Sequence, residues 1–272
     1  MLVDLPSWGG LAWKALEGLR QKGCTNYSEL EQLKNLDPKK QLSIAKIIAS
    51  ENDTDLDLRK YLAHDASDIG IYKYLNRIGC VCVTTNYDEL LSPRFQIKTD
   101  PSTTAYTITR ITEKEEFHAG LLNEPGTVIH LHGSVNYPDT MILTTEEYLK
   151  HYDYPTVQNF LMELFEKKTV LFMGYGLDEA EILEHILRRA RVKYTEEKKR
   201  FALQEFFISQ DPLYRRLYAY YEESFGIHLI GYIRDYKDYG QLEDISKTWA
   251  EQIEVRPTAL VDELDFMKEV LQ

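Results

Sequence analysis

Cysteine is scarce in this sequence. The 272 residues include only Cys24, Cys80 and Cys82, and no two of them form a Cys-x-x-Cys pair. A four-cysteine structural zinc site is therefore excluded. Cys80 and Cys82 lie on one side of a predicted buried strand, because side chains alternate along a strand, and the valines around them favour packing. The odd number and this setting indicate reduced core thiols.

Positive charge and long hydrophobic runs are also in short supply. Lys and Arg total 32 against 44 Asp and Glu, which gives a formal net charge of −12. No long basic run offsets this charge, so the surface should repel bare nucleic acid. No apolar stretch approaches the roughly 20 residues that span a bilayer, and the N-terminus lacks the pattern of a signal peptide. We therefore expect a cytoplasmic location, with no direct contact to nucleic acid or membrane.

Three apolar runs, each ending in polar residues, organise the chain. They cover residues 79–88 (GCVCVTTNYD), 127–134 (TVIHLHGS) and 169–178 (TVLFMGYGLD). Apolar runs without polar alternation, rich in β-branched residues, indicate strands buried on both faces. In a parallel sheet the carboxyl ends of the strands form the edge where ligands bind. The three polar ends are therefore predicted to converge on one crevice.

Helical patterns alternate with these strands. Ser7 is a predicted N-cap for a helix over 8–21, and Asp37 and Pro38 are the N-cap and first residue of another helix within a helical stretch at 26–78. The remaining predicted elements are an edge strand at 105–111, a short strand at 141–143, helices from 144, at 155–167 and at 178–192, a strand at 206–209 with a helix through 220, a strand at 226–232, and helices at 239–253 and 257–272. This alternation predicts an α/β fold: a doubly wound Rossmann-like parallel sheet with a helical insertion, in one domain over 1–272.

Several of these polar residues have structural interpretations as well. Asn86 and Asp88 are residue types that cap helices and form turns. His130 shares a strand face with His132, so a His-x-His metal pair is conceivable, although no third ligand stands nearby in the sequence. The acidic residues at 53–57, with Arg59, could indicate a metal nuclease, but a solvated helix face explains them better. We predict no bound metal.

In this order along the chain, the three loops resemble those of the sirtuin family: an Asn-and-Asp loop, a His-Gly loop and a nucleotide-holding Gly loop. The resemblance is strongest to the sirtuin-like NAD hydrolases of bacterial anti-phage defence, whose loops read Thr-Thr-Asn-Tyr-Asp, His-Gly-Ser and Gly-Tyr-x-x-Asp. It covers nearly the whole chain. It implies a glycohydrolase that cleaves NAD, its substrate, to nicotinamide and ADP-ribose.

The resemblance also implies roles for single residues. Asn86 would position water or a ribose hydroxyl, and His132, titrating near neutrality, would be the base. Asp88 would bind the nicotinamide carboxamide, and Trp8 would lie against the nicotinamide ring. Gly174 and Gly176 would let the backbone approach ribose and phosphates. The other implied NAD contacts are Pro6, Ser7, Thr85, Gly133, Tyr175, Asp178, Ser209 and Tyr232.

One expected motif is missing from this sequence. Only residues 1–5 precede Pro6, too few for the family's first strand and its glycine-rich phosphate loop. A non-catalytic subunit that binds nucleotide or assembles with an ATPase is therefore the alternative hypothesis. Because an unregulated NAD hydrolase is toxic to its own cell, we also expect a homo-oligomer and a defence partner of the ATPase or helicase type.

Overall fold

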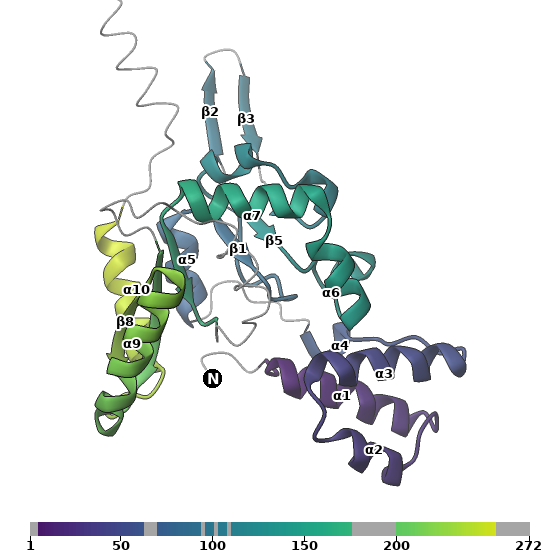
Figure 1. Ribbon diagram of the computed structural model, residues 1–272. Helices are drawn as coiled ribbons and strands as arrows, with labels where there is room; N and C mark the ends of the chain where they lie inside the picture. The colour runs from purple at the N-terminus through teal and green to yellow at the C-terminus, as the bar shows by residue number, and fades with distance from the viewer. Residues whose placement is uncertain are drawn as a thin grey trace, which may run out of the picture.

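The first of two parallel sheets carries the Asn86 and His132 loops. In the computed structural model, which describes residues 5–62, 70–93, 96–100, 103–107, 110–175 and 200–253, β1 (Cys82–Thr84), β5 (Val128–His130) and β4 (Arg110–Ile111) pair in the order β1-β5-β4. Both pairings are parallel, and Thr84 stands opposite His130. The polar residues that follow β1 and β5 therefore leave the sheet at the same edge (Figure 1).

The second sheet is parallel throughout its described part. It has the order β6-β7-β8, with β6 (Val170–Met173), β7 (Arg200–Phe206) and β8 (Ile227–Ile233). The predicted strand at 206–209 is wrong: the strand ends at Phe206, and residues 208–210 form the 3₁₀ helix η4 (Ile208–Gln210). Charged residues at 197–200 obscured the start of β7, where Arg200 is buried.

Two further strand predictions need correction. The expected edge strand at 105–111 is divided between β3 (Thr103–Thr107) and β4, and β3 forms an antiparallel hairpin with β2 (Gln96–Asp100). The segment 141–143, predicted as a short strand, is a loop. It lies beside the end of β5, where the Ile142 amide donates to the His132 carbonyl, but this one backbone bond does not make a strand pairing. The predicted helices at 178–192 and 257–272 lie outside the described residues.

Side-chain caps fix several helix starts near their predicted positions. The Ser7 side chain accepts from the Gly10 amide at the start of α1, and Asp37 accepts from the amides of Lys39 and Lys40 at the start of α3. The described helices are α1 (Trp8–Gln21), α2 (Tyr27–Leu33), α3 (Pro38–Glu51), α4 (Arg59–Leu62), α5 (Gly70–Ile78), α6 (Thr145–Tyr152), α7 (Pro155–Lys167), α9 (Asp211–Phe225) and α10 (Gly240–Gln252).

One hydrophobic core joins the two sheets. Helix α7 contributes Val157, Phe160, Leu161 and Phe165 to a buried cluster that includes Ile129 and Leu131 near β5 and Ala202 and Leu229 in the second sheet. Burying each large apolar side chain stabilises the fold by about 1.5 to 3 kcal/mol. The shared core and the parallel strands confirm the predicted Rossmann-like α/β class. The single sheet expected for all three loop-bearing strands is wrong, because β6 pairs with β7 in the second sheet.

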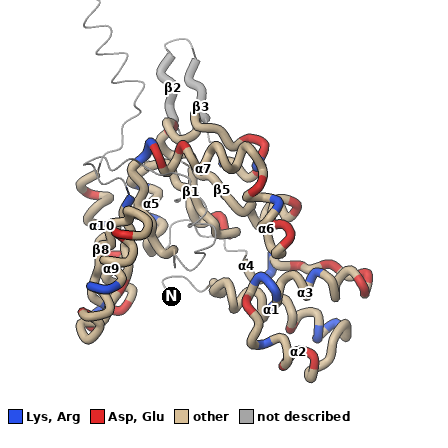
Figure 2. The backbone as a smooth tube through the Cα atoms, in the orientation of Figure 1, with Lys and Arg blue, Asp and Glu red and all other residues tan. Residues whose placement is uncertain are grey.

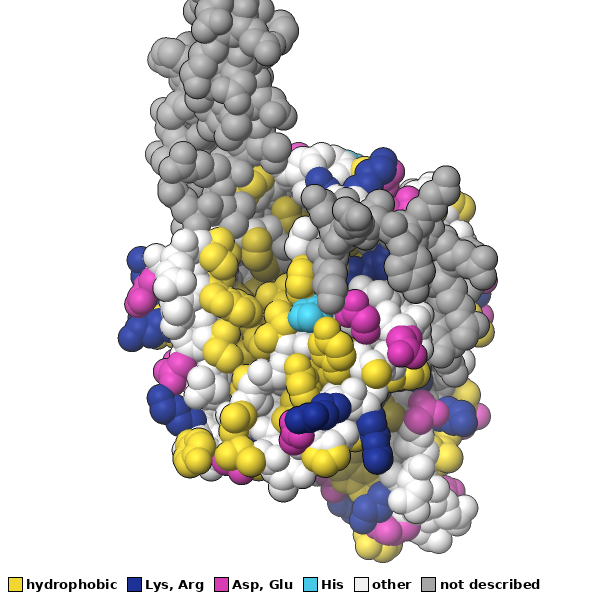
Figure 3. All heavy atoms as spheres, turned by 60° about the vertical axis from the view of Figure 1, so that its left-hand side comes forward, with side chains coloured by type: hydrophobic (Ala, Val, Ile, Leu, Met, Phe, Trp, Pro, Cys, Tyr) yellow, Lys and Arg dark blue, Asp and Glu magenta, His cyan; other side chains and the backbone are white. Residues whose placement is uncertain are grey.

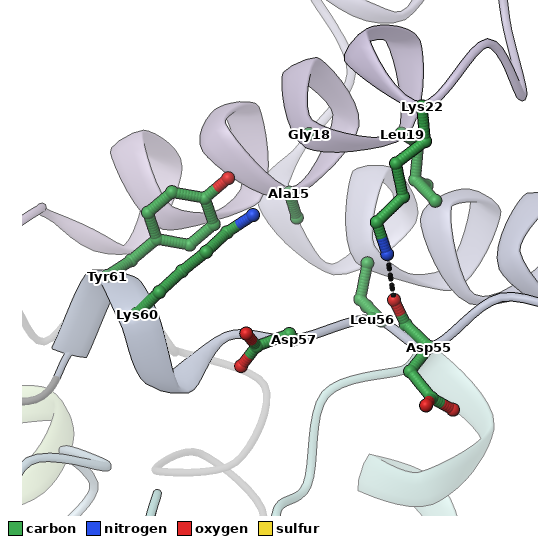
Figure 4. Close-up of a pocket in the computed structure, with 9 residues that line it drawn as sticks. All are labelled: Ala15, Gly18, Leu19, Lys22, Asp55, Leu56, Asp57, Lys60 and Tyr61. Atoms are coloured by element: carbon green, nitrogen blue, oxygen red, sulfur yellow. Dashed lines mark hydrogen bonds between the residues drawn. The ribbon is translucent and has the colours of Figure 1, made fainter.

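A second core places the helices α1 to α4 against the loops of the first sheet. Leu11, Leu16 and Leu42 of these helices pack in one cluster with Tyr87 and Val135, which follow β1 and β5. Within this helical layer, Lys22 at the end of α1 donates to the Asp55 carbonyl over 2.9 Å and so connects α1 to the segment that precedes α4 (Figure 4). Residues 53–58 are a loop, so the expected helix face for these acidic residues is wrong. The helical layer thus rests directly on the predicted site.

The described surface is mixed in charge and partly apolar. Lys, Arg, Asp and Glu are interspersed over the helices (Figure 2). Hydrophobic side chains gather over a broad area of the face that carries α9 and α10 (Figure 3). The exposed hydrophobic residues after β7 and near the end of β8 include Phe207, Ile208, Ile233 and Tyr236. None of the described helices is long and apolar enough to cross a membrane.

Arg200 ties the second sheet to the ends of two helices. Its guanidinium donates to the carbonyl of Phe165 near the end of α7 and, over 3.0 Å, to the carbonyl of Phe225 at the end of α9. We expect Arg200→Met to lower the free energy of unfolding by about 2 to 4 kcal/mol, because the buried Phe165 carbonyl and the partly buried Phe225 carbonyl lose their donor.

Urea unfolding measures this effect. Arg215→Met is the matched control, since Arg215 is exposed and paired with Asp211 on one helix face, and it should cost less than about 1 kcal/mol. Equal losses in the two variants would contradict the anchoring role of Arg200.

Candidate active site

The loops after β1 and β5 are joined by a continuous set of hydrogen bonds. The Leu131 amide donates to the Thr84 carbonyl over 2.8 Å, and the Val135 amide donates to the Tyr87 carbonyl over 2.9 Å. Between them, the carbonyls of Thr85 and Asn86 accept from the rings of His132 and His130. Four consecutive carbonyls of the first loop are therefore held by the second, and the structure brings these predicted site loops together.

Asn86 lies exposed at this edge. Its side chain is hydrogen-bonded to the hydroxyl of Tyr72 on α5, and burial, together with the nearby Asp88 carboxylate, raises the pKa of that hydroxyl. No helix begins within the described residues 85–93, so helix capping does not explain Asn86. An exposed amide with a fixed partner can orient a bound water or hydroxyl.

Asp88 is almost fully buried beside Asn86. One carboxylate oxygen accepts from the Leu90 amide over 3.2 Å, so the predicted turn role is present. Burial raises the pKa of Asp88, and this effect outweighs the hydrogen bonds to Leu90 and its own amide and the charge of Arg110. A carboxyl group of this kind is a suitable hydrogen-bond partner for an amide of a ligand.

His132 lies in a closed aromatic cage formed by α6. Its Nε2 is 2.6 Å from the Tyr152 hydroxyl, and its Nδ1 is 3.3 Å from the Tyr148 hydroxyl. Burial lowers the pKa of His132 to about 3, with further lowering by His151 and Lys39. The expected titration near neutrality is therefore wrong. The ring is neutral at pH 7, which is the form that accepts a proton.

His130 belongs to a separate polar network. Arg110 on β4 donates to its Nε2, so the neutral ring carries its proton on Nδ1, which donates to the Asn86 carbonyl over 3.2 Å. Burial and the Arg110 charge lower the pKa of His130 to about 4. Arg110 also approaches Glu89, which accepts from the Ser134 hydroxyl. This network holds the backbone of the Asn86 loop against β4 and β5.

The two histidines thus have different partners, which argues against a His-x-His metal pair. The described residues contain no group of three His, Cys, Asp or Glu side chains placed to hold a metal ion.

Gly133 separates His132 from Ser134 in a conformation that requires glycine. Its φ is +79°, and a Cβ built there would lie 2.2 Å from the Thr140 carbonyl oxygen. The Ser134 amide donates to the Thr140 hydroxyl over 3.1 Å, which holds the turn against the segment that returns to His132. Gly133 therefore sets the path of the loop.

Of the predicted site residues at the start of α1, which are Pro6, Ser7 and Trp8, one contacts the Asn86 loop. The centroid of the Trp8 ring lies 5.6 Å from that of the Tyr87 ring, and Tyr87 is the residue between Asn86 and Asp88 in the sequence. Ser7 is exposed and serves as the N-cap, while Pro6 precedes it in an extended segment. Trp8 is thus the member of this group that contacts the Asn86 loop.

Helix α5 brings the second sheet to the site. Tyr72, the partner of Asn86, packs in one cluster with Met173, the last residue of β6, and with Tyr232 of β8. Gly174 follows Met173 with φ +61°, and the Tyr175 ring stacks 6.0 Å from Phe172. Burial raises the pKa of Tyr232 to about 12, and the exposed Ser209 follows β7 in η4. Gly176 and Asp178 lie outside the described residues.

Sequence reasoning missed the side chains that support these residues. Arg110, Glu89 and Tyr72 come from three separate segments, and no local pattern connects them. Tyr148 and Tyr152 offered a usable signal, because aromatic residues four apart lie on one face of the helix predicted from residue 144.

Comparison with known families agrees with this geometry. A family model described as a SIR2-like domain matches residues 81–230, more than half of the 272 residues. The match begins at the first residue after Cys80 and includes both joined loops, β6, β7, the first part of β8, and the helices α6, α7 and α9. No curated protein matches the chain.

The requirement for glycine at 133 is testable against a matched site. Gly23 after α1 has nearly the same φ, +80°, but a Cβ there meets no described atom within 4 Å. Gly23→Ala should cost about 1 to 2 kcal/mol from the left-handed backbone alone. Gly133→Ala should cost at least about 2 kcal/mol more, because the Thr140 backbone must move. Guanidinium unfolding compares the two, and similar losses would show that the loop relaxes freely.

Acid should destabilise the protein through its buried histidines. His151 lies 6.0 Å from His132 between ring centroids, and neither of its nitrogens finds a hydrogen-bond partner among the described residues. Burial and Lys114 lower the pKa of His151 to about 4. Below pH 6.5 the unfolded chain binds the proton first, so stability is full above that pH and falls as pH decreases towards 4.

We therefore expect His151→Phe to recover about 2 kcal/mol at pH 5 relative to wild type, with little loss at pH 7. Urea unfolding at both pH values gives the comparison. His118→Phe is the control, because His118 is exposed. An unchanged pH dependence in His151→Phe would rule out a buried neutral His151.

Proposed function

Because the chain belongs to the SIR2-like family, whose members are NAD-dependent enzymes, we propose that it is an NAD glycohydrolase that releases nicotinamide and ADP-ribose. The observation that carries this proposal is the joined pair of loops, which holds the exposed Asn86 and the buried Asp88 on one loop and the His-Gly-Ser turn on the other. We further propose that the protein is the effector of an anti-phage defence complex, on the resemblance of its loops alone.

The reaction needs few groups from the protein. Water adds to C1 of the nicotinamide ribose, the glycosidic bond breaks, and nicotinamide leaves as a neutral base with the bonding electrons. The water loses one proton during this step, so the site must orient the water and accept that proton. A strong acid at the leaving group is unnecessary.

The described residues suit these tasks. The Asn86 amide, held by Tyr72, would orient the water or a ribose hydroxyl. The Asp88 carboxyl, with its pKa raised by burial, would bond the carboxamide. His132 would accept the proton as a neutral imidazole once its Nε2 exchanges the Tyr152 hydroxyl for the substrate. His132 would therefore act as the base only after its hydrogen bond to the Tyr152 hydroxyl has broken.

The remaining contacts extend along NAD. Trp8 would lie against the nicotinamide, and Thr85 and Gly133 would offer backbone groups near the ribose. Gly174, Tyr175, Gly176 and Asp178 would face the phosphates and the second ribose, with Ser209 and Tyr232 at the carboxyl edge of the second sheet. A homo-oligomer, an ATPase or helicase partner and a cytoplasmic location are part of the proposal.

A non-catalytic subunit is the second candidate. The closed cage around His132 favours it, because both ring nitrogens are engaged by tyrosines and burial holds the pKa at about 3. Such a subunit would bind nucleotide, or assemble with an ATPase, without turnover. It would use the same edge without opening the Tyr152 contact.

Nicotinamide release from NAD separates the two candidates. In the full chain with its partner present, Asn86→Asp should reduce turnover by about 10² to 10⁴, because the amide donor is lost and a charge is added. Asn35→Asp, an exposed site between α2 and α3, is the matched control and should keep full activity. The same loss should follow His132→Gln, and thermal unfolding of each variant separates chemistry from folding.

Two outcomes would decide against the enzyme. A wild type that binds NAD but releases no nicotinamide with any defence partner would establish the binding subunit. Full activity in Asn86→Asp would remove Asn86 from the site even if the protein hydrolyses NAD.

A further inference from the structure

Two thiols are in contact at the start of β1. The Sγ atoms of Cys80 and Cys82 are 3.8 Å apart, and both cysteines are free and partly buried. They project from one side of the strand, while Val81 and Val83 pack against the core on the other side. Cys24 belongs to the separate cluster around α1. Packing alone explains the valines but does not require two thiols in contact.

The contact makes the two thiols chemically unequal. A hydrogen bond from the Cys82 thiol stabilises the Cys80 thiolate and lowers the pKa of Cys80 to about 7. The same interaction, together with burial, raises the pKa of Cys82. The thiolate is the nucleophilic form, so Cys80 is the attacking group and Cys82 is the group that follows.

We propose that Cys80 and Cys82 form a redox-active dithiol that closes reversibly to a disulfide. The oxidant is a low-molecular-weight disulfide of the glutathione class. The Cys80 thiolate attacks one of its sulfurs, forms a mixed disulfide and expels one thiolate. Cys82 then loses its proton and attacks Cys80 Sγ, which expels the second thiolate. One dithiol and one small disulfide thus give one protein disulfide and two small thiols.

The backbone around the pair permits this closure at a cost. In an extended strand, residues two apart have Cα atoms about 6.6 Å apart, near the upper limit of about 6.8 Å for a disulfide. Closure must therefore draw Cys80 and Cys82 together. Gly79, with φ +71°, can absorb the movement on one side.

The movement would reach the Asn86 loop. The Cys80 carbonyl accepts from Gly126 over 3.3 Å, and the Cys82 amide donates to the Thr127 carbonyl over 2.9 Å. These bonds set the register between β1 and β5, so puckering of β1 would disturb the strand four residues before Asn86. The disulfide form should have a less ordered loop and, if the proposed NAD hydrolysis holds, lower activity.

Mass spectrometry of the native full chain tests the dithiol without reference to activity. After treatment with glutathione disulfide, wild type and Cys24→Ser should each lose the mass of two hydrogens, and reduction should restore it. Cys82→Ser should instead carry one glutathione on Cys80, and Cys80→Ser, which lacks the attacking thiolate, should form neither the internal disulfide nor this adduct. Peptide mapping should place the bond between residues 80 and 82.

A trivalent phenylarsenical supplies a second readout, because it binds two thiols at once without drawing them to bonding distance. It should bind wild type and Cys24→Ser in a one-to-one ratio. It should not bind Cys80→Ser or Cys82→Ser, because each of these variants lacks one thiol of the pair. Glutathione adducts in wild type without an internal disulfide, or arsenical binding that depends on Cys24, would overturn the proposal. Neither result would bear on NAD hydrolysis by the reduced protein.

Discussion

The hydrogen bonding between the loops after β1 and β5 is the constraint on which the rest of the site depends. Parallel strands normally diverge into independent loops, but here the carbonyls of residues 84–87 are held one after another by residues 130–135. Two of these four bonds use histidine rings in place of backbone amides. Side-chain identity at 130 and 132 therefore controls the backbone path on the neighbouring strand.

Layers on opposite sides of this joined pair hold it in place. Tyr87 faces the helical layer, where it packs with Leu16 and bonds to the Ile142 carbonyl, and Tyr72 on α5 holds Asn86 against the second sheet. On the side of β4, Arg110 connects Glu89 and His130. The exposed amide of Asn86 is thus held on a closely packed frame, as preorganised sites require.

The sequence predicted the parts of this arrangement that are local. The helix at 8–21 with its Ser7 cap, the strand cores at β1, β5 and β6 and the alternation that defines the fold class follow from periodicity, capping and β-branched runs. The start of β7 was missed because a buried arginine resembles a surface residue. The cage around His132 was missed because burial by α6 depends on packing between distant segments, and burial determines the pKa.

The fixed position of each residue in the first loop carries a consequence for how the loop can vary in length. Tyr87 enters the helical core, while Asn86 lies exposed and its backbone meets His130. A one-residue insertion or deletion between Thr84 and Asp88 would break the matched hydrogen bonds to the loop after β5 and displace the Tyr87 ring from the helical core. Homologous loops should therefore tolerate changes of residue type far better than changes of length, and grafting experiments should transplant residues 84–88 only as an intact block.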